Sequence, residues 1–187
     1  MREVSIALTH YPVLDRQGEI VTTAITNLDL HDMARSARVF GLRNMFVVHP
    51  VAAQRQLAEC IQQHWTSGSG ARRIPDRVAP MELLRVAASL AQVYQELGGR
   101  DRIELWTTSA KSNDSSVCPY SDSRARIHSS GPPVLIVFGT GWGLAPQVIE
   151  DADLRLAPIH AASNTGFNHL SVRAACAITL DRLLGER

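Results

Sequence analysis

The chain has 187 residues, of which 45% are hydrophobic and 20% are charged, a balance typical of one folded domain with a sizeable core. This composition excludes a disordered chain, a collagen-like repeat and a small scaffold held by disulfides. The formal net charge is only +1 at pH 7, so any contact with RNA or DNA must come from a local cluster of arginines. We find no linker or internal repeat and expect residues 1–187 to form a single domain.

The cysteines and the N-terminal segment indicate the cellular compartment of the protein. Cys60, Cys118 and Cys176 are widely separated, which favours reduced thiols in the cytoplasm over disulfides or a zinc site. Residues 1–9 are interrupted by charges and lack a small-residue cleavage site, and no apolar run is long enough for a membrane helix. We therefore expect a cytoplasmic protein with no membrane segment and no bound metal.

The beginning of the chain predicts a parallel crossover unit. Residues 4–9 and 44–49 are short apolar runs typical of buried strands. Between them we expect a helix that is capped by Asn27 or Asp29 and ended by Gly41. Its apolar positions have helical spacing: Leu30, Met33, Ala34 and Ala37. The order strand, helix, strand predicts a mostly parallel sheet covered by helices.

Two more helices are expected before residue 100. Residues 51–65 have apolar side chains four apart, as in an amphipathic helix: Leu57, Ile61 and Trp65. Residues 66–77 are rich in Gly and Ser and predict a surface loop with a small basic cluster. The next helix is expected over residues 80–97, with apolar side chains three and four apart: Leu83, Val86, Leu90, Val93 and Leu97.

The second half of the chain alternates short apolar runs with polar segments. We expect a long polar loop over residues 108–133, and loops of that length are usually functional or disordered. The apolar runs predict strands over residues 103–107, 134–138 and 154–156, and helices over residues 144–149 and 170–184.

A glycine-rich segment directly after an apolar strand is the strongest local signal. In FGTGWGL, residues 138–144, glycines alternate at Gly139, Gly141 and Gly143. Backbone groups without side chains approach a ligand closely, and ligands bind at strand ends in open parallel sheets. Trp142 offers a stacking surface for a planar ring. The alternative is a tight turn that needs positive backbone angles, and GxGxG is a weak match to the dinucleotide fingerprint.

Two polar segments supply further candidates. On a helix, His31 and Arg35 are four apart and Asp32 and Arg35 are three apart, so each pair can touch; an ordinary surface of ion pairs explains this pattern as well. Before the last helix, Asn168 or Ser171 is expected to cap the helix, which leaves free N–H groups for a polar ligand.

Taken in order, these segments resemble the SPOUT superfamily of RNA methyltransferases. The three motifs are TNLDLHDMARSARVFGLRNMFVV, VLIVFGTGWGLA and LRLAPIHAASNTGFNHLSVRAACAITLDRLL. THYPV, TNLDLHDMAR and FNHLSVRAA are similar to a bacterial family of SAM-dependent RNA methyltransferases, or tRNA guanine-N1 methyltransferase-like proteins. The resemblance implies an α/β SPOUT fold with a mostly parallel sheet, a C-terminal trefoil knot, a homodimer, the cofactor S-adenosylmethionine (SAM) and an RNA substrate.

The resemblance also assigns residues to the site. SAM would lie among three loops, at Thr107, Thr108, Ser109, Gly139, Thr140, Gly141, Trp142, Gly143, Leu144, Ile159, Asn168, His169, Leu170 and Ser171. The candidates for RNA contact are Asn27 and the two arginine clusters seen in the residue pattern, namely Arg72, Arg73 and Arg77, and Arg124 and Arg126. A dimer would double these clusters into one composite groove.

Three residues are candidates for the chemistry of methyl transfer. Arg35 falls where ribose-methylating members of the superfamily carry their motif arginine. Those members have an Asn six residues earlier, whereas this chain has Asp29. Asp29 or His31 is therefore the alternative, as a base toward a ring nitrogen instead of a ribose 2′-oxygen.

Two other functions remain open from the residues alone. One is a non-catalytic module that holds RNA or a nucleotide on the same fold. The other is a dinucleotide-dependent oxidoreductase, which rests only on the glycines of FGTGWGL.

Overall fold

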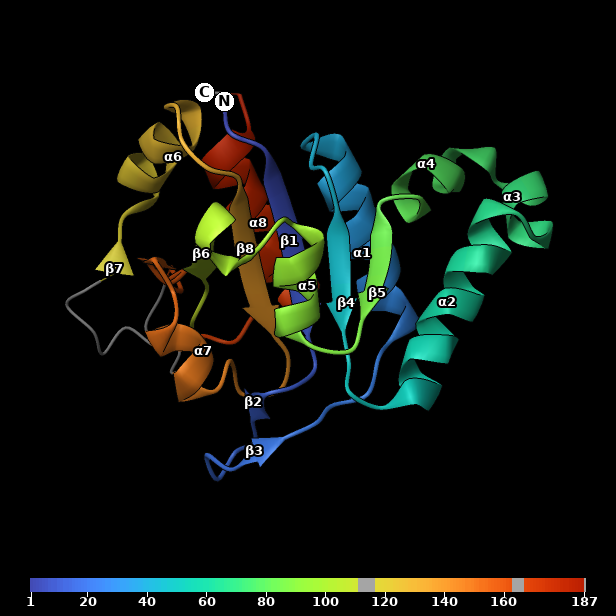
Figure 1. Ribbon diagram of the computed structural model, residues 1–187, viewed down its shortest axis with the longest axis horizontal. Helices are drawn as coiled ribbons and strands as arrows, with labels where there is room; N and C mark the ends of the chain where they lie inside the picture. The colour runs from blue at the N-terminus through green and yellow to red at the C-terminus, as the bar shows by residue number, and fades with distance from the viewer. Residues whose placement is uncertain (111–116, 163–166, 187) are drawn as a thin grey trace.

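In the computed structural model, which describes residues 1–110, 117–162 and 167–186, a parallel sheet of seven strands runs through the centre of the molecule (Figure 1). The strand order is β5-β4-β1-β8-β6-β9-β7, and every pairing is parallel. The strands are β1 (Val4–Thr9), β4 (Met45–Val48), β5 (Leu84–Ala87), β6 (Glu104–Thr107), β7 (Val117–Cys118), β8 (Val134–Gly139) and β9 (Leu154–Leu156), and a separate antiparallel pair is formed by β2 (Val13–Leu14) and β3 (Ile20–Val21).

Helices connect the strands. They are α1 (Asn27–Val39), α2 (Ala52–Thr66), α3 (Ser69–Arg73), α4 (Val78–Met81), α5 (Leu90–Glu96), α6 (Tyr120–His128), α7 (Pro146–Glu150) and α8 (Val172–Leu184), with short 3-10 turns η1 (Pro75–Arg77) and η2 (Arg100–Arg102). In the described part of the chain, no helix is long and apolar enough to cross a membrane.

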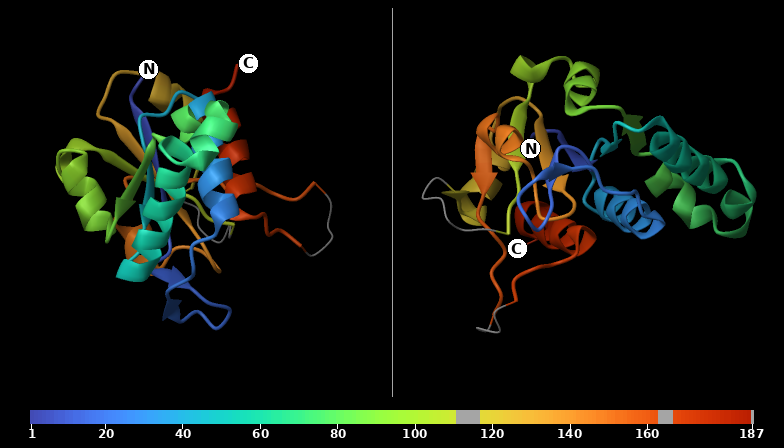
Figure 2. Two further views of the ribbon diagram at one scale, coloured as in Figure 1. Left: turned by 90° about the vertical axis from the view of Figure 1, so that its right-hand side faces the viewer. Right: turned by 90° about the horizontal axis from the view of Figure 1, so that it is seen from below.

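The sheet is covered on both faces, which explains why its central strands β1 and β8 are apolar except for Ser5 and Thr9. One face packs against α1 and α8, with Met33 and Leu180 fully buried. The other face packs against α5 and α7, with Val93 and Val148 buried. Figure 2 shows these two helical layers on either side of the sheet. The predicted α/β class with a mostly parallel sheet is confirmed.

The predicted helix over residues 80–97 is wrong. Strand β5 lies in the middle of it, pairs with β4 and buries Leu84 and Ala87 at the edge of the sheet. The apolar residues spaced by three and four lie in the turn after α4, in β5, and in α5 with its C-cap. Ser89 marks the real helix start, because its side chain accepts a hydrogen bond from the Gln92 backbone N–H.

Other expectations also need correction. Residues 66–77 contain α3 and η1 rather than a plain loop, and the polar stretch 108–133 contains β7 and α6. In α2 only Ala58 is buried, and Leu57 of the expected apolar face is 43% exposed. Thr26, and neither predicted residue, caps α1 by accepting from the Asp29 N–H. Parts of two predicted segments, residues 111–116 and 163–166, lie outside the described residues.

Candidate functional site

A cavity of about 430 Å³ opens where β6, β8 and β9 end. Three of its walls are the segments that follow these strands, and a fourth is the segment that leads into α1. The lining residues are Thr23, Ala24, Thr26, Asp29, Thr108, Ser109, Ala110, Tyr120, Phe138, Gly139, Thr140, Gly141, Trp142, Gly143, Ala157, Ile159, Asn168, His169, Leu170, Ser171, Val172, Arg173, Ala175 and Thr179. The cavity therefore lies at the carboxyl end of a parallel sheet, where such folds bind ligands.

The structure brings together most of the residues that the motifs assign to the cofactor. Twelve of the fourteen line the cavity. Thr107 and Leu144 are each 3% exposed and belong to the packed interior beside it. A ligand in the cavity therefore has no direct access to either side chain.

The glycine loop is shaped by its own backbone. Gly141 has a φ of +60°, and a Cβ there would lie 2.7 Å from the carbonyl oxygen of Leu14. The Trp142 N–H donates to that same oxygen at 2.9 Å, and the Leu14 N–H donates to the Gly143 carbonyl at 2.9 Å. Gly141 thus fits the loop against β2 rather than clearing space for a ligand, so the alternative of a conformational turn explains this glycine.

Gly143, in contrast to Gly141, has open space where a side chain would lie. It has a φ of +109°, a region that L side chains rarely adopt, and no atom lies within 4 Å of a Cβ built there. Because Gly143 lines the cavity, the loop exposes bare backbone to the cavity at Gly143. At Gly141 the backbone is packed against β2.

Asn168 holds two of the walls together. Its Oδ1 accepts from the Ala161 N–H at 2.7 Å, and its Nδ2 donates to the Ala110 carbonyl at 3.4 Å. Ser171 caps α8, as expected, by accepting from the Ala174 N–H at 3.4 Å. Both predicted polar residues are therefore used to build the wall.

Aromatic rings gather at the rim of the cavity. The His169 ring lies 5.3 Å from Trp142 and 5.8 Å from Phe167, both in edge-to-face arrangements. Trp142 is 45% exposed and Phe167 is 67% exposed, so these rings offer planar surface to the solvent at the mouth.

Asp29 brings a carboxylate to the cavity wall. It is only 7% exposed, and both of its oxygens are held: Arg173 Nη1 donates to Oδ1 at 3.1 Å, and Thr26 Oγ1 donates to Oδ2 at 2.6 Å. Arg173 also reaches Asp32, with Nε 3.5 Å from Oδ2. This network fixes the carboxylate in one orientation beside the ligand space.

Two buried histidines lie behind the segment that leads into α1. His10 Nδ1 is 3.0 Å from Thr23 Oγ1, and His49 Nε2 is 2.9 Å from the Thr23 carbonyl. Burial, with a smaller contribution from His49, lowers the pKa of His10 to about 4. Burial also lowers the pKa of His49. Both imidazoles are therefore neutral near pH 7 and act as fixed hydrogen-bonding groups.

The other two catalytic candidates lie outside the cavity. Arg35 is exposed and lines a shallow groove between α1 and α8, with Val39 and Ala177. His31 faces α2, where its ring lies edge-on to Trp65 at 5.0 Å. Burial, followed by the charge of Arg77, lowers the pKa of His31. Asn27, the candidate for RNA contact, is exposed at the start of α1.

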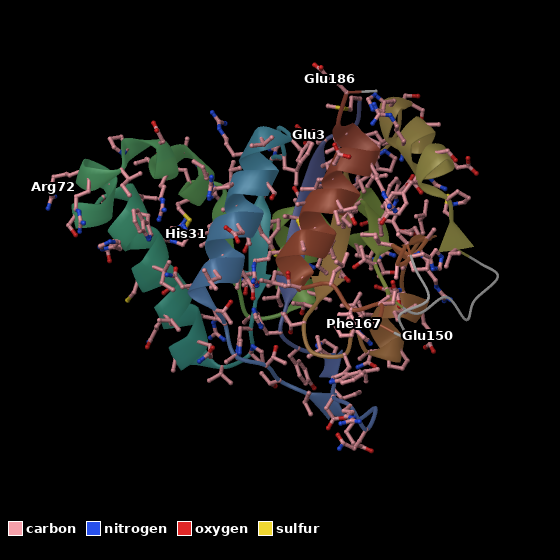
Figure 3. The ribbon with its side chains drawn as sticks, turned by 180° about the vertical axis from the view of Figure 1, so that it is seen from behind. Glu3, His31, Arg72, Glu150, Phe167 and Glu186 are labelled. Carbon is pink, nitrogen blue, oxygen red and sulfur yellow. The ribbon has the colours of Figure 1, made fainter. Side chains whose placement is uncertain are left out.

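The candidate RNA-binding arginines form two separate groups. Arg72 and Arg73 are exposed on α3, and Arg72 lies far from Phe167 at the cavity rim (Figure 3). The Arg77 guanidinium stacks over Trp65 at 4.5 Å. The second group, on α6, is tied down, since Arg126 Nε donates to Glu104 at 2.8 Å and Arg124 Nη1 donates to the Arg182 carbonyl at 3.4 Å.

Sequence reasoning missed the residues that act through long-range contacts. His10 and Arg173 lie in the segments THYPV and FNHLSVRAA but were given no role in the site, and Thr23 and His49 lie outside the quoted motifs. The one sequence signal is that His10 and His49 each directly follow an apolar strand. Among the residues the structure describes, no group of three or more His, Cys, Asp and Glu side chains is arranged to hold a metal.

Comparison with known proteins identifies the family to which the chain is similar. Residues 3–185 match the model of a family described as SAM-dependent RNA methyltransferase. A protein of Aquifex aeolicus described as uncharacterized is 40% identical over 98% of this chain and 89% of its own length. A tRNA (guanine-N(1)-)-methyltransferase of Nitratidesulfovibrio vulgaris is 37% identical over 99% of this chain, but this chain spans only 43% of that protein.

Solved structures share the fold at low sequence identity. The SpoU methyltransferase AviRb of Streptomyces viridochromogenes superimposes with a TM-score of 0.61 at 15% identity, over 97% of this chain and 58% of AviRb. A second AviRb structure, in complex with the cofactor AdoMet, gives a TM-score of 0.56 at 13% identity, over 98% of this chain and 57% of AviRb. The arrangement of strands and helices is therefore that of the SpoU methyltransferases.

Proposed function

Because the chain belongs to the family of SAM-dependent RNA methyltransferases, we propose that its cavity binds SAM and that it methylates a base nitrogen of tRNA. The observation that carries the choice of a nitrogen is the position of Asp29, which lines the cavity as a fixed carboxylate. The name of the Nitratidesulfovibrio vulgaris relative points to guanine N1 as the acceptor.

The cavity suits the cofactor in size and chemistry. Its volume of about 430 Å³ lies in the usual range for small-molecule sites. Ile159 and Leu170 supply apolar surface for a ring, and Gly143 leaves backbone bare beside it. When bound, SAM supplies a methyl group on a positively charged sulfur, ready for transfer to a nucleophile.

Asp29 is the proposed base. Guanine N1 carries a hydrogen, so methylation at N1 would form a bond from nitrogen to the methyl carbon, break the bond from that carbon to sulfur with S-adenosylhomocysteine as the leaving group, and require the N1 proton to leave. The carboxylate of Asp29 accepts that proton, with Arg173 and Thr26 holding it in place. Transfer to a ribose 2′-oxygen has less support, because Arg35 lies in the groove between α1 and α8.

The RNA is proposed to enter across the aromatic rim. Trp142, His169 and Phe167 provide surfaces on which an unstacked base packs, as in many proteins that act on single bases. Arg72 and Arg73 are proposed to contact the phosphate backbone at a distance from the reacting base.

We also propose a homodimer and the C-terminal trefoil knot. Leu28 and Val39 on α1 are 61% and 77% exposed, and the groove that contains Val39 runs between α1 and α8. Pairing two copies through this face buries exposed apolar surface. It also brings Arg35, in the same groove, to the interface between the copies.

One titration series tests the cofactor assignment. Purified protein is titrated calorimetrically with SAM, with its product S-adenosylhomocysteine (SAH) and with NAD. We expect saturable binding of SAM and SAH and no binding of NAD. Tight binding of NAD alone would instead support the dinucleotide-dependent oxidoreductase.

A second measurement tests the reaction. The protein is incubated with tRNA and SAM that carries a labelled methyl group, and the digested nucleosides are identified by mass spectrometry. We expect label in 1-methylguanosine. Binding of SAM without methyl transfer to any RNA would leave the non-catalytic module as the better description.

A further inference from the structure

We propose that Thr23 and Thr140 form a pair of hydroxyl groups that only accept hydrogen bonds from the ligand, and so select an N–H donor. Both residues line the cavity, one from the segment before α1 and one from the glycine loop. The inference rests on the proposed function and adds to it the chemical group that this part of the cavity recognises.

The direction of the hydrogen bonds follows from counting protons. The two hydroxyl oxygens of Thr23 and Thr140 are hydrogen-bonded to each other. Thr140 Oγ1 also donates to the Thr9 carbonyl at 3.2 Å. A threonine hydroxyl has one proton, so Thr140 has none left and Thr23 must donate to it.

His10 continues the chain in the same direction. The hydroxyl proton of Thr23 is already used in the hydrogen bond to Thr140. In the contact of 3.0 Å between His10 Nδ1 and Thr23 Oγ1, His10 is therefore the donor. The other ring nitrogen, Nε2, is buried without a hydrogen-bond partner among the described residues. In this tautomer Nε2 carries a lone pair and no hydrogen, which avoids an orphaned buried N–H.

The backbone of Thr23 is held as firmly as its side chain. The Val51 N–H donates to His49 Nδ1 at 3.1 Å, so the proton of neutral His49 is on Nε2, which donates to the Thr23 carbonyl at 2.9 Å. The Thr23 N–H donates to the His10 carbonyl at 3.1 Å. Two buried histidines, one after β1 and one after β4, therefore set the position of Thr23 before any ligand arrives.

The consequence is that this part of the cavity can accept hydrogen bonds from a ligand but cannot donate them. Both hydroxyl protons are used inside the protein, and each oxygen keeps one lone pair for the cavity. A ligand carbonyl or carboxylate placed there would meet another acceptor, whereas an amino group would be paired. Two N–H sources are at hand: the amino groups of the cofactor, and the N2 amino group of a guanine edge.

The test compares ligands that differ by one amino group. Wild type, Thr140→Val and Thr140→Ser are titrated with SAH, with its analogue lacking the α-amino group, and with S-inosylhomocysteine, in which the adenine amino group is replaced by oxygen. The guanine arm uses GMP and IMP, which lacks the N2 amino group, in protein saturated with SAH. Thr22→Val, at an exposed neighbour of Thr23, is the matched control, and thermal melting checks that each variant folds.

We expect Thr140→Val to weaken the ligand that carries the recognised amino group by about tenfold. Its matched analogue should bind Thr140→Val no more weakly than wild type, while Thr140→Ser and Thr22→Val retain wild-type affinity. The arm in which this difference occurs identifies the cofactor or the base as the source of the N–H.

The inference is overturned if Thr140→Val weakens all ligands alike, which would mean that the hydroxyls only shape the loop, or if it weakens none. Failure of the wild type to bind SAH refutes the proposed function instead. In that case GMP and IMP are titrated into the protein alone, and the same comparison of wild type with Thr140→Val decides the inference.

Discussion

Arg173 and Asp29 join the first turns of α8 and α1 through an ion pair of 3.1 Å between Nη1 and Oδ1. Asp29 is 7% exposed, so Arg173→Gln leaves a buried carboxylate without its cation. We expect the free energy of unfolding in urea to fall by about 1–2 kcal/mol. Arg43→Gln is the control, because its pair with Glu3 is exposed on both sides and should contribute little. Equal losses in the two variants would contradict the stabilising role of the Arg173 pair.

Asp29→Asn should abolish most of the methylation and spare the cofactor. The amide keeps the size of the side chain but does not take up a proton at neutral pH, so we expect the rate to fall by roughly 10²–10⁴-fold. Affinity for SAH should stay within about threefold of wild type. Asp32→Asn is the control, since Asp32 shares Arg173 but does not line the cavity. If both variants methylate tRNA at the wild-type rate, Asp29 is not the base.

Stability should depend on the protonation of His10 in mild acid. The pKa of His10 is about 4 in the folded protein and 6.5 in the unfolded chain, where the imidazole is in water. Between these two pH values the unfolded state binds the extra proton, so stability is fully present above pH 6.5 and is lost as the pH falls toward 4. The loss from this one group is at most about 3 kcal/mol.

The measurement is urea unfolding at several pH values between 4 and 7. His10→Gln should show a smaller loss across this window than wild type, because its side chain does not titrate. A control substitution at the exposed His128, His128→Gln, should keep the wild-type dependence. Parallel curves for wild type and His10→Gln would refute the assignment.

Val39→Arg should weaken the proposed dimer. Val39 is 77% exposed in the groove between α1 and α8, and a charge there disfavours burial against a second copy. Analytical ultracentrifugation should show a shift toward monomer at the same protein concentration. Val51→Arg, at an exposed valine that precedes α2, should leave the equilibrium unchanged.

Replacing Arg72 and Arg73 by Ala should weaken tRNA binding without affecting SAH. Each phosphate contact contributes to the release of counterions, so the slope of log affinity against log salt should fall by about 2. The control is the double substitution Arg43→Ala and Arg102→Ala, at exposed arginines paired with Glu3 and Asp101. An unchanged salt slope would show that α3 does not contact the RNA.

The central part of the fold was predictable because burial leaves a strong pattern. Strand β8 is apolar on both faces, β1 is apolar apart from Ser5 and Thr9, and both strands are covered on both sides. The α6 helix was not predictable in this way, because only Ser123 and Ile127 of its residues are buried. A single buried aliphatic side chain gives no helical period, so the contacts with α8 decide the structure there.

The functional site also contains residues that could be predicted from the sequence and residues that could not. The backbone-rich loop around Gly141 and Gly143 was visible because positive φ angles restrict residue choice. Arg173 and Thr23 were not visible, since their importance comes from partners more than 100 residues away: the Arg173 partner Asp29 is separated by 144 positions and the Thr23 partner Thr140 by 117. No local pattern reports such pairings.

The pairing of β1 with β8 also fixes the timing of folding during synthesis. Val4 lies opposite Val134, so the ribosome must produce most of the chain before the central strand gains its second neighbour. Until then β1 has an open edge, and strands waiting for distant partners are prone to wrong association. The cavity walls come from equally distant segments, so a ligand can stabilise only the finished polypeptide and cannot guide its early folding. The nascent chain must therefore rely on β4 alone to shield β1 through most of its translation.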